Sequence, residues 1–274
     1  MKNRVVLITG STDGVGRRLA ERLGQAGATV LIHGRDATRA DLLCEAIRSN
    51  GGRAFPHLAD FASLGAVRTL AAHVQRDHGR LDILINNAGI GVGRPEMPRE
   101  LSRDGHELRF AVNYLAGFLL TRLLLPALVA SKGRIVNVAS IGQHPLDFTD
   151  IMLSRAYSGR RAYCQSKLAQ VIFTFDLADE LASTGVCVNA LHPATYMDTT
   201  MVRRDGIQPV SSIDEGADAI LHLAAATELA GQTGLYFDGR RPARADPQAY
   251  DATARKLLRA LSFELTGLSP TSAS

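Results

Sequence analysis

The chain alternates short apolar runs with longer segments in which apolar residues recur every three or four positions. The short runs have the length of strands and cover residues 5–8, 29–32, 53–58, 81–85, 134–138, 186–191 and 234–237. The longer segments predict helices near residues 15–26, 36–49, 62–78, 104–130, 160–183, 213–229 and 248–264. Since the runs are apolar on both faces and helices separate them, the pattern predicts a parallel sheet covered on both sides.

The series of elements continues without an internal repeat or a linker. A chain of 274 residues is long enough to bury a large core as one α/β domain. We therefore expect one domain over residues 1–240, a C-terminal helical extension of it over 241–265, and a frayed tail over 266–274.

Composition narrows the class of protein. Hydrophobic residues make up 46% of the chain and charged residues 21%, which is typical of a globular protein and excludes wholesale disorder. The net charge is +4, but the basic residues are scattered among acids, Trp is absent, and aromatic residues are only 5%. We therefore expect a solvated, arginine-rich surface and no nucleic-acid partner.

Cysteine usage and hydropathy bear on the compartment. The three cysteines are widely spaced with no CxxC, so we expect neither a disulfide framework nor a metal site, and a reducing compartment fits best. The first apolar run is too short for a secretory signal. The most apolar stretch, 111–130, is interrupted by Asn113 and Arg122, so we expect no membrane span and a cytoplasmic protein.

A glycine-rich segment stands between the first expected strand and the first expected helix. Residues 9–16 read Thr-Gly-Ser-Thr-Asp-Gly-Val-Gly. Glycines there let the backbone turn tightly and approach a pyrophosphate, whose charge is stabilised at the helix N-terminus. A tight turn without a ligand could use the same glycines, so the context of strand and helix matters. The residues expected to bind a dinucleotide are Gly10, Ser11, Thr12, Gly14, Val15 and Gly16.

Four further motifs follow this loop along the chain. They are Asn-Asn-Ala-Gly at 86–89, Asn113 inside a long helical segment, Ser140 at the end of a strand, and Tyr-Cys-Gln-Ser-Lys at 163–167. With the glycine loop, this ordered set resembles the short-chain dehydrogenase/reductase family from about residue 5 to residue 237. Three segments resemble the retinol-dehydrogenase-like branch of this family: Asp-Gly-His-Glu-Leu at 104–108, Ser-Lys-Leu-Ala-Gln at 166–170 and Ala-Leu-His-Pro at 190–193.

The resemblance implies a fold, a cofactor and an assembly. The fold would be a doubly wound parallel sheet, the Rossmann fold, with seven strands in the order 3-2-1-4-5-6-7 and a ligand crevice at their carboxyl ends. The cofactor would be a nicotinamide dinucleotide, and the substrate a small carbonyl or alcohol. Because the helices near 104–130 and 160–183 pair subunits in many relatives, we expect a homodimer.

Tyr163 and Lys167 can supply the proton that hydride transfer to a carbonyl requires. A free tyrosine has a pKa of about 10 and is a poor base at neutral pH. Lys167 lies four residues later on the same helix face, and a nearby ammonium favours the phenolate. We therefore predict that Tyr163 is the general acid or base. Tyr157 and Arg161 have the same spacing, but arginine does not exchange its proton usefully, so we expect Tyr157 on the surface or the substrate side.

The family pattern assigns roles to further residues. Ser140 would hydrogen-bond the substrate oxygen, Lys167 would also hold the nicotinamide ribose, and Asn113 would order a water relay behind the lysine. Asn113 could instead satisfy a kink in its helix. The cofactor contacts implied by the resemblance are Asp60 at the adenine, together with Asn87, Ala88, Gly89, Tyr163, Lys167, Thr195 and Thr199.

The segment after the sixth strand departs from the family pattern. The family usually has Pro-Gly there, whereas this chain has Pro-Ala at 193–194. The loss of the glycine implies a less extreme backbone angle, which puts the nicotinamide-side contacts of Thr195 and Thr199 in doubt. His192 is expected to be structural rather than catalytic. Asp60 could be a plain turn residue.

The end of the second strand bears on the choice between NADP and NAD. An NAD-specific enzyme places an acid there to accept hydrogen bonds from the free ribose 2′-hydroxyl. The family pattern puts that acid at Gly34, which Arg35 follows, and a guanidinium can pair with a 2′-phosphate. Asp36 has a suitable spacing from the glycine loop, but it more naturally caps the helix that begins near Ala37. NADP is therefore favoured over NAD.

The sequence as a whole predicts an NADP-dependent oxidoreductase that acts on a carbonyl or alcohol, with a lipophilic ketone or aldehyde as its substrate. Segments 141–160 and 194–212 would form a lid over the pocket, with apolar walls from Ile151, Met152, Leu153, Tyr196 and Met201. One alternative is a catalytically idle NADP-binding sensor or scaffold of the same fold. A sugar epimerase or dehydratase is disfavoured, because it would need another glycine spacing and a larger C-terminal domain.

Overall fold

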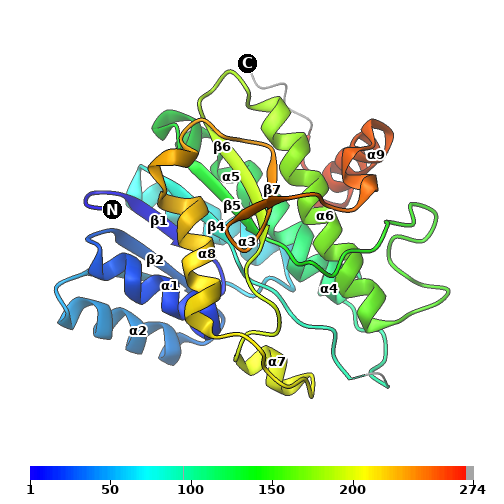
Figure 1. Ribbon diagram of the computed structural model, residues 1–274, viewed down its shortest axis with the longest axis horizontal. Coiled ribbons are helices and arrows are strands. Elements are labelled where there is room, and N and C mark those ends of the chain that lie inside the picture. Colours follow the sequence, from blue (N-terminus) through cyan, green and yellow to red (C-terminus); the bar gives the residue numbers. More distant parts are fainter. Residues whose placement is uncertain (95, 270–274) are drawn as a thin grey trace.

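The computed structural model describes residues 1–94 and 96–269 as one twisted sheet with helices on both faces (Figure 1). The strands lie in the order β3-β2-β1-β4-β5-β6-β7-β8, and β1 to β7 are parallel. The predicted doubly wound fold and the strand order 3-2-1-4-5-6-7 are confirmed. The parallel strands are β1 Val5–Ile8, β2 Thr29–Gly34, β3 Arg53–Leu58, β4 Ile83–Asn86, β5 Arg134–Val138, β6 Cys187–His192 and β7 Leu235–Asp238.

An eighth strand was missing from the prediction of seven. β8 (Arg241–Ala243) pairs antiparallel with β7 at the edge of the sheet. The turn between them uses Gly239, whose φ is 58°. Pro242 is tolerated in β8 because an edge strand does not need every N–H. Three residues with a proline at the centre carry no readable alternation, so the pattern could not reveal this strand.

Two hydrophobic cores lie on the two faces of the sheet. Within β1, Val6 and Ile8 point to one core and Leu7 to the other, and all three are fully buried. The first core is covered by α1 (Gly14–Gln25), α2 (Ala37–Ser49) and α8 (Ile213–Ala225). The second is covered by α3 (Leu64–His78), α5 (Ala116–Ser131) and α6 (Gly159–Glu180), with α9 (Ala252–Thr266) outside α6.

The helix expected near 104–130 is interrupted by a wider turn. It begins as α4 (Leu108–Phe110), passes through the π-helical turn η1 (Ala111–Leu115), and continues as α5. The helices expected near 213–229 and 248–264 each include a separate 3-10 turn, η2 (Thr227–Leu229) and η3 (Pro247–Tyr250). A five-residue helix, α7 (Thr200–Arg204), was not predicted, because so short a segment shows no helical period.

The stretch Leu108–Ser131 is long and apolar enough to cross a membrane, judged by length and composition alone. Half of its most apolar window is buried inside the fold. Arg122 pairs with Glu180 of α6 at 2.5 Å, and α5 packs against α3. This is the arrangement of a core helix, and the absence of a membrane partner stays a prediction.

Helix α9 lies on the outer side of α6. Arg255 and Arg259 of α9 pair with Asp179 and Asp176 of α6. α9 thus covers part of the surface through which a homodimer was expected to form, and the dimer stays a prediction. The helix extends through Thr266, within the expected tail, and residues 270–274 of that tail lie outside the described residues.

Candidate active site

The predicted site residues lie where strands of the sheet end. The glycine loop follows β1, Asn87 follows β4, and Ser140 follows β5. Tyr163 and Lys167 enter from the first turns of α6. Since β1 is the strand at which the order of the sheet reverses, this edge is the place where α/β sheets bind ligands.

The glycine loop is packed too closely for side chains. A Cβ atom built on Gly16 would lie 2.2 Å from the Gly10 carbonyl oxygen, and one on Gly10 would lie 2.8 Å from Ala88 Cα. Gly10 and Gly14 also have φ values of 64° and 53°, which favour glycine. The backbone is therefore bare at the N-terminus of α1. This cradle fits a pyrophosphate held by backbone N–H groups.

The side chains of the loop have structural tasks. Ser11 Oγ accepts a hydrogen bond from His33 N at 2.9 Å, and Val15 is buried in the core. Asp13 caps α1, and its side chain accepts from Gly14 N at 2.7 Å. Ser11 and Val15 therefore offer the cofactor chiefly their backbone, as a phosphate loop requires.

His33 supports the loop from β2 and was missed in the sequence. Its Nδ1 accepts from Gly10 N at 3.0 Å, and its Nε2 lies 3.2 Å from the Ala59 carbonyl oxygen. The ring must therefore be neutral, with its proton on Nε2. Burial lowers the pKa of His33 to about 4, which agrees with this tautomer. An isolated histidine within a strand gives no sequence signal for such a role.

The Asn-Asn-Ala-Gly segment ties β4 to the loop. Asn87 Nδ2 donates to the carbonyl oxygens of Thr9 and Gly10, at 2.9 and 3.1 Å. The amide N–H groups of Asn87 and Ala88 both donate to Thr9 Oγ1. A Cβ on Gly89 would lie 3.3 Å from Asn113 Oδ1 and 3.7 Å from Lys167 Nζ. The segment therefore connects the phosphate loop with the lysine.

Ser140 and Tyr163 face each other across a narrow space. A Cβ built on Gly142 would lie 3.5 Å from Ser140 Oγ and 3.9 Å from Tyr163 Cε1. Burial raises the pKa of Tyr163, and a hydrogen bond with Ser140 acts in the opposite direction. Tyr236, which the sequence did not single out, donates to the Ser140 carbonyl oxygen at 3.0 Å. The strand end that carries Ser140 is therefore held from β7.

Lys167 is buried beside Tyr163. Its Nζ lies 5.8 Å from the centroid of the Tyr163 ring, and it donates to Val138 O at 2.8 Å and to Gln170 Oε1 at 3.0 Å. Burial lowers the pKa of Lys167 to about 7. The sequence predicts that the ammonium depresses the pKa of Tyr163, whereas burial raises the pKa of this phenol.

Asn113 lies in the π-helical turn and joins three elements. Its Oδ1 accepts from Ile90 N at 2.8 Å, and its Nδ2 donates to Ile90 O at 3.1 Å and to Ser166 Oγ at 2.9 Å. Ser166 Oγ in turn donates to the Tyr163 carbonyl oxygen at 2.7 Å. Asn113 thus braces the loop after β4 and the start of α6, and its part in a water relay stays a prediction.

The segment after β6 reaches the phosphate loop through one of its two threonines. A Cβ on Gly14 would lie 3.2 Å from Thr199 Cγ2, and Thr199 also caps α7. Thr195 Oγ1 lies 3.1 Å from His192 Nε2. The buried His192 ring is therefore used inside its own segment, which agrees with a structural role.

Three other polar residues occupy the periphery of the site. Asp60 Oδ1 accepts from Ala62 N at 3.1 Å in a turn, so its contact with adenine stays a prediction. The half-buried Tyr157 hydroxyl accepts a hydrogen bond from Arg109 Nη1 at 2.6 Å, and its place on the surface or the substrate side stays a prediction. Asp205, which the sequence did not single out, accepts from Gly93 N at 3.2 Å and so joins the segment after α7 to the loop after β4.

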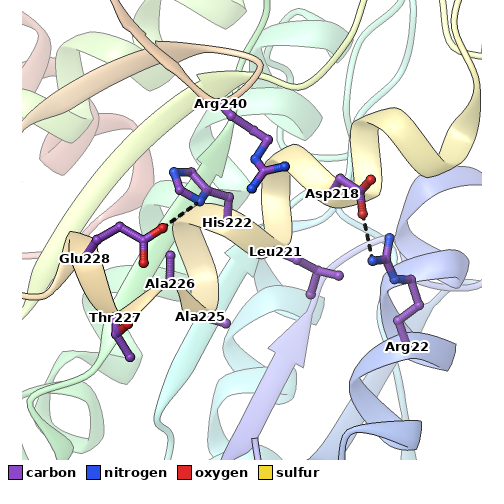
Figure 2. Close-up of a pocket in the computed structure, with 9 residues that line it drawn as sticks. All are labelled: Arg22, Asp218, Leu221, His222, Ala225, Ala226, Thr227, Glu228 and Arg240. Atoms are coloured by element: carbon purple, nitrogen blue, oxygen red, sulfur yellow. Dashed lines mark ion pairs between the residues drawn. The ribbon is translucent and has the colours of Figure 1, made fainter.

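The surface pocket in Figure 2 lies elsewhere. It has a volume of about 430 Å³ beside α8, and no predicted site residue lines it. Arg22 pairs there with Asp218 at 2.7 Å, and His222 with Glu228 at 3.6 Å. Its charged side chains largely satisfy one another, so the chemistry gathers at the carboxyl edge of the sheet. Among the residues that the structure describes, no group of three metal-ligating side chains is found.

Comparison with known proteins identifies the family. Residues 4–208 match the short chain dehydrogenase family. Human retinol dehydrogenase 13 is 37% identical over 97% of this chain and 85% of its own length. A metagenomic short-chain oxidoreductase in complex with NADP is 28% identical, with a TM-score of 0.68 over 89% of this chain and 99% of that one. The 3-ketoacyl-(acyl-carrier-protein) reductase of Brucella melitensis, complexed with NADH, is 27% identical, with a TM-score of 0.70 over 87% and 98%. The chain therefore belongs to the short-chain dehydrogenase family and resembles its retinol dehydrogenases, oxidoreductases that transfer hydride between a nicotinamide cofactor and a small-molecule substrate.

Proposed function

We propose that the protein is an NADP-dependent oxidoreductase that interconverts a lipophilic ketone or aldehyde and its alcohol. The observation that carries the choice of cofactor is the close packing at the end of β2. A Cβ built on Gly34 would lie 2.5 Å from Thr12 Cγ2 and 2.7 Å from Thr12 Oγ1. The chain therefore has no acidic side chain for the ribose 2′-hydroxyl at this position, and one placed there would require Thr12 to move. Arg35 follows with an exposed side chain that can pair with a 2′-phosphate.

Asp36, the alternative acid for an NAD enzyme, is engaged in the helix that follows. Its Oδ1 accepts from Arg39 N at 3.1 Å and so caps α2, as the sequence predicts. The Arg39 guanidinium lies 3.6 Å from the same carboxylate. Relatives of known structure contain either NADP or NADH, so the proposal depends on these residues of this chain.

The test of the cofactor compares binding of NADPH and NADH to the wild type and to Arg35→Ala. We expect NADPH to bind more tightly, and the variant to lose at least about tenfold in NADPH affinity while NADH affinity changes little. Arg76→Ala, which removes the same charge from an exposed pair with Asp77 on α3, is the matched control. Tighter binding of NADH by the wild type, or unchanged NADPH affinity in Arg35→Ala, would refute NADP.

The proposed substrate class is supported by apolar side chains around the loop after β4 and by Tyr196 in the segment after β6. Tyr196 and Met201 are 45% and 38% exposed, and Met97 is 40% exposed. A Cβ on Gly91 would lie 3.0 Å from Met201 Cγ, and one on Gly93 would lie 3.1 Å from Met97 Sδ. These side chains offer a lipophilic molecule a surface near Asp205.

Part of the expected apolar wall serves another purpose. Ile151 and Leu153 are buried, and Ile151 and Met152 pack with the second core. The Met152 carbonyl oxygen also accepts a hydrogen bond from Arg99 Nε at 2.8 Å. The lipophilic wall of the proposal is therefore narrower than the sequence implied, and consists of Tyr196 and Met201 with Met97.

The proposed chemistry assigns one task to each central side chain. When bound, the nicotinamide supplies or accepts the hydride. Ser140 would donate a hydrogen bond to the substrate oxygen, and Tyr163 would deliver or take the proton at that oxygen. Lys167 would hold the ribose hydroxyls beside Tyr163.

The test of the reaction uses a panel of ketones, aldehydes and alcohols of graded chain length with each nicotinamide cofactor, followed by absorbance of the reduced nicotinamide. We expect turnover with NADPH on carbonyl substrates, and a kcat/KM that rises as the substrate becomes more lipophilic. Cofactor binding without any turnover across the panel would instead favour the idle sensor.

A further inference from the structure

Gln170 contacts the ammonium of Lys167, and nothing in the family motifs gives it a task. It lies three residues after Lys167 on α6, so both side chains lie on one face of the helix. The Lys167 Nζ donates to Gln170 Oε1 at 3.0 Å. Lys167 is 5% exposed and Gln170 is 4% exposed, so water does not replace this contact.

We propose that Gln170 is a positioning residue, whose side-chain oxygen acts with the Val138 carbonyl to fix the direction in which the Lys167 ammonium faces the cofactor ribose and Tyr163. This proposal deepens the proposed function and rests on it, because it takes Lys167 to be the residue that holds the ribose.

The geometry of an ammonium carries the argument. Lys167 Nζ has three N–H groups, and two of them are directed to Gln170 Oε1 and Val138 O. The directions of two N–H bonds fix that of the third, which is left for the cofactor or the phenol. Because an ammonium cannot accept a hydrogen bond, the amide must face it with its oxygen. A buried cation without such acceptors would be strongly disfavoured.

Gln170 is itself held in place by a chain of buried polar groups. Thr174 Oγ1 donates to the Gln170 carbonyl oxygen at 2.7 Å, and Asn137 Nδ2 donates to Thr174 Oγ1 at 2.8 Å. Asn86 Nδ2 donates to Asn137 Oδ1 at 2.8 Å. The chain joins α6 to β5 and β4, so the turn of α6 that carries Gln170 keeps a fixed height above the sheet.

The groups around Lys167 are mostly uncharged. Tyr163 faces it from α6, Asn113 lies near it on η1, and β5 offers only the Val138 carbonyl. His192 on β6 interacts with Lys167, and burial lowers the pKa of that histidine. The negative charge of Asp238 on β7 acts in the opposite direction and raises the pKa of His192. A neutral acceptor at position 170 therefore leaves the protonation of Lys167 sensitive to any charge placed there.

The test replaces Gln170 in two opposite ways. Gln170→Met keeps the length of the side chain and removes the acceptor, so the pKa of Lys167 should fall below its wild-type value of about 7. Gln170→Glu offers a carboxylate, which should raise that pKa by at least about one unit. If Gln170 served only to fill space, the two variants would not shift the pKa of Lys167 in opposite directions.

NMR of the lysine side chains in the cofactor-free protein measures the pKa of Lys167 directly. The chain contains only four lysines, and Lys2, Lys132 and Lys256 are exposed. With ¹³C-labelled lysine, the Cε signal of Lys167 can be followed against pH, and Lys167→Arg assigns it. Ser262→Ala is the matched control: it breaks a buried hydrogen bond, between Tyr114 and Ser262, that involves neither Gln170 nor Lys167, and should leave the Lys167 midpoint within about 0.3 units.

Cofactor binding and turnover complete the experiment. We expect Gln170→Met to bind the reduced cofactor at least about fivefold more weakly, with the alkaline limb of its pH–rate profile at lower pH, and Gln170→Glu to move that limb to higher pH. If Gln170→Met does not fold, Gln170→Leu replaces it, and if Gln170→Glu does not fold, Gln170→Asp replaces it. Shifts of the Lys167 midpoint in the same direction in both variants, or no shift, would overturn the proposal. Absence of turnover in the wild type would refute the proposed function alone, since the midpoints are measured without cofactor.

Discussion

Burial controls the protonation of the two central side chains, Tyr163 and Lys167. It raises the pKa of the Tyr163 phenol and lowers that of the Lys167 ammonium to about 7. Both shifts favour the uncharged form of each group. At neutral pH the phenol therefore keeps its proton, which is the state that a general acid needs in the reduction of a carbonyl.

Replacing Tyr163 by phenylalanine should remove the proton donor and little else. The ring remains beside Lys167, so we expect the affinity for the cofactor to stay nearly unchanged while turnover falls by at least about 10²-fold. Steady-state kinetics on a substrate from the panel, with cofactor binding by fluorescence, measure the two effects separately. More than about a tenth of wild-type turnover in this variant would be incompatible with the role of the hydroxyl.

His33 should make the fold sensitive to acid. Its pKa is about 4 in the folded protein and about 6.5 in an unfolded chain, so the unfolded state binds a proton at a pH where folded His33 does not. The stability is complete above about pH 6.5 and decreases as the pH falls toward 4, by roughly 3 kcal/mol from this residue.

The measurement is urea unfolding at several pH values between 7 and 4. In His33→Asn the free energy of unfolding should depend less on pH by about one proton, whatever its absolute value. His73→Asn, at an exposed position on α3, is the control and should keep the wild-type slope. Equal slopes for wild type and His33→Asn would contradict the assignment of a neutral, buried ring.

Sequence motifs located Tyr163, Lys167 and Ser140 because a short spacing or a strand end marks each of them. His33 and Gln170 were not recognised, since their partners lie on other elements or depend on where a side chain points. A hydrogen bond between residues 23 positions apart in the sequence, such as that between Gly10 and His33, leaves no local pattern.

Among the elements, the glycine loop is the one whose backbone is most constrained. Gly16→Ala would place a methyl group 2.2 Å from the Gly10 carbonyl oxygen and 2.6 Å from Asn87 Nδ2. Backbone cannot move aside cheaply, so we expect at least about a tenfold loss of cofactor affinity and a lower Tm. Binding titration and thermal unfolding measure these.

The control for this substitution is Gly65→Ala in α3. The added methyl group would have its nearest neighbour, Ser63 Oγ, at 3.6 Å, which is ordinary contact. Alanine also favours a helix more than glycine does, so the variant should be as stable as the wild type or more so. If Gly16→Ala behaved like Gly65→Ala, the close approach of the loop to β4 would not be needed for binding.

The periodicity of the sequence predicted seven strands and seven longer helices, because each buries apolar residues at a regular spacing. It did not predict β8, α7 or the π-helical turn, whose lengths of three to five residues are too short to show a period. Ser158 and Ser63 cap α6 and α3, and the predicted starts of these helices are correct to within two residues.

At the scale of the whole molecule, α9 extends the second core beyond the sheet and its covering helices. Phe263 of α9 packs edge-on against Phe118 of α5, with 5.5 Å between ring centroids. The buried hydroxyl groups of Tyr114 and Ser262 form a hydrogen bond, with 2.6 Å between their oxygen atoms. We therefore expect the C-terminal helix to unfold together with the helices of the site.

Arg259→Ala should therefore reduce the stability of the entire fold. Asp176, its partner on α6, has a side chain only 5% exposed, and its carboxylate would remain buried without its cation. We expect the free energy of unfolding to fall by about 1–3 kcal/mol in a single transition. Chemical denaturation followed by two independent probes checks this, with Arg76→Ala as the control for an exposed pair. Two separate transitions would mean that α9 unfolds on its own.

The π-helical turn at Ala111–Leu115 makes the number of residues in the continuous helix from α4 to α5 as important as its side chains. Within the turn, Asn113 contacts Ile90 and Ser166, whereas after it Phe118 and Leu124 lie in the core. Removal of one residue would restore a uniform helix and rotate one half against the other by about 100°. Asn113 or the apolar stripe would then face the wrong neighbours. Single-residue insertions and deletions should therefore be tolerated far less well here than substitutions.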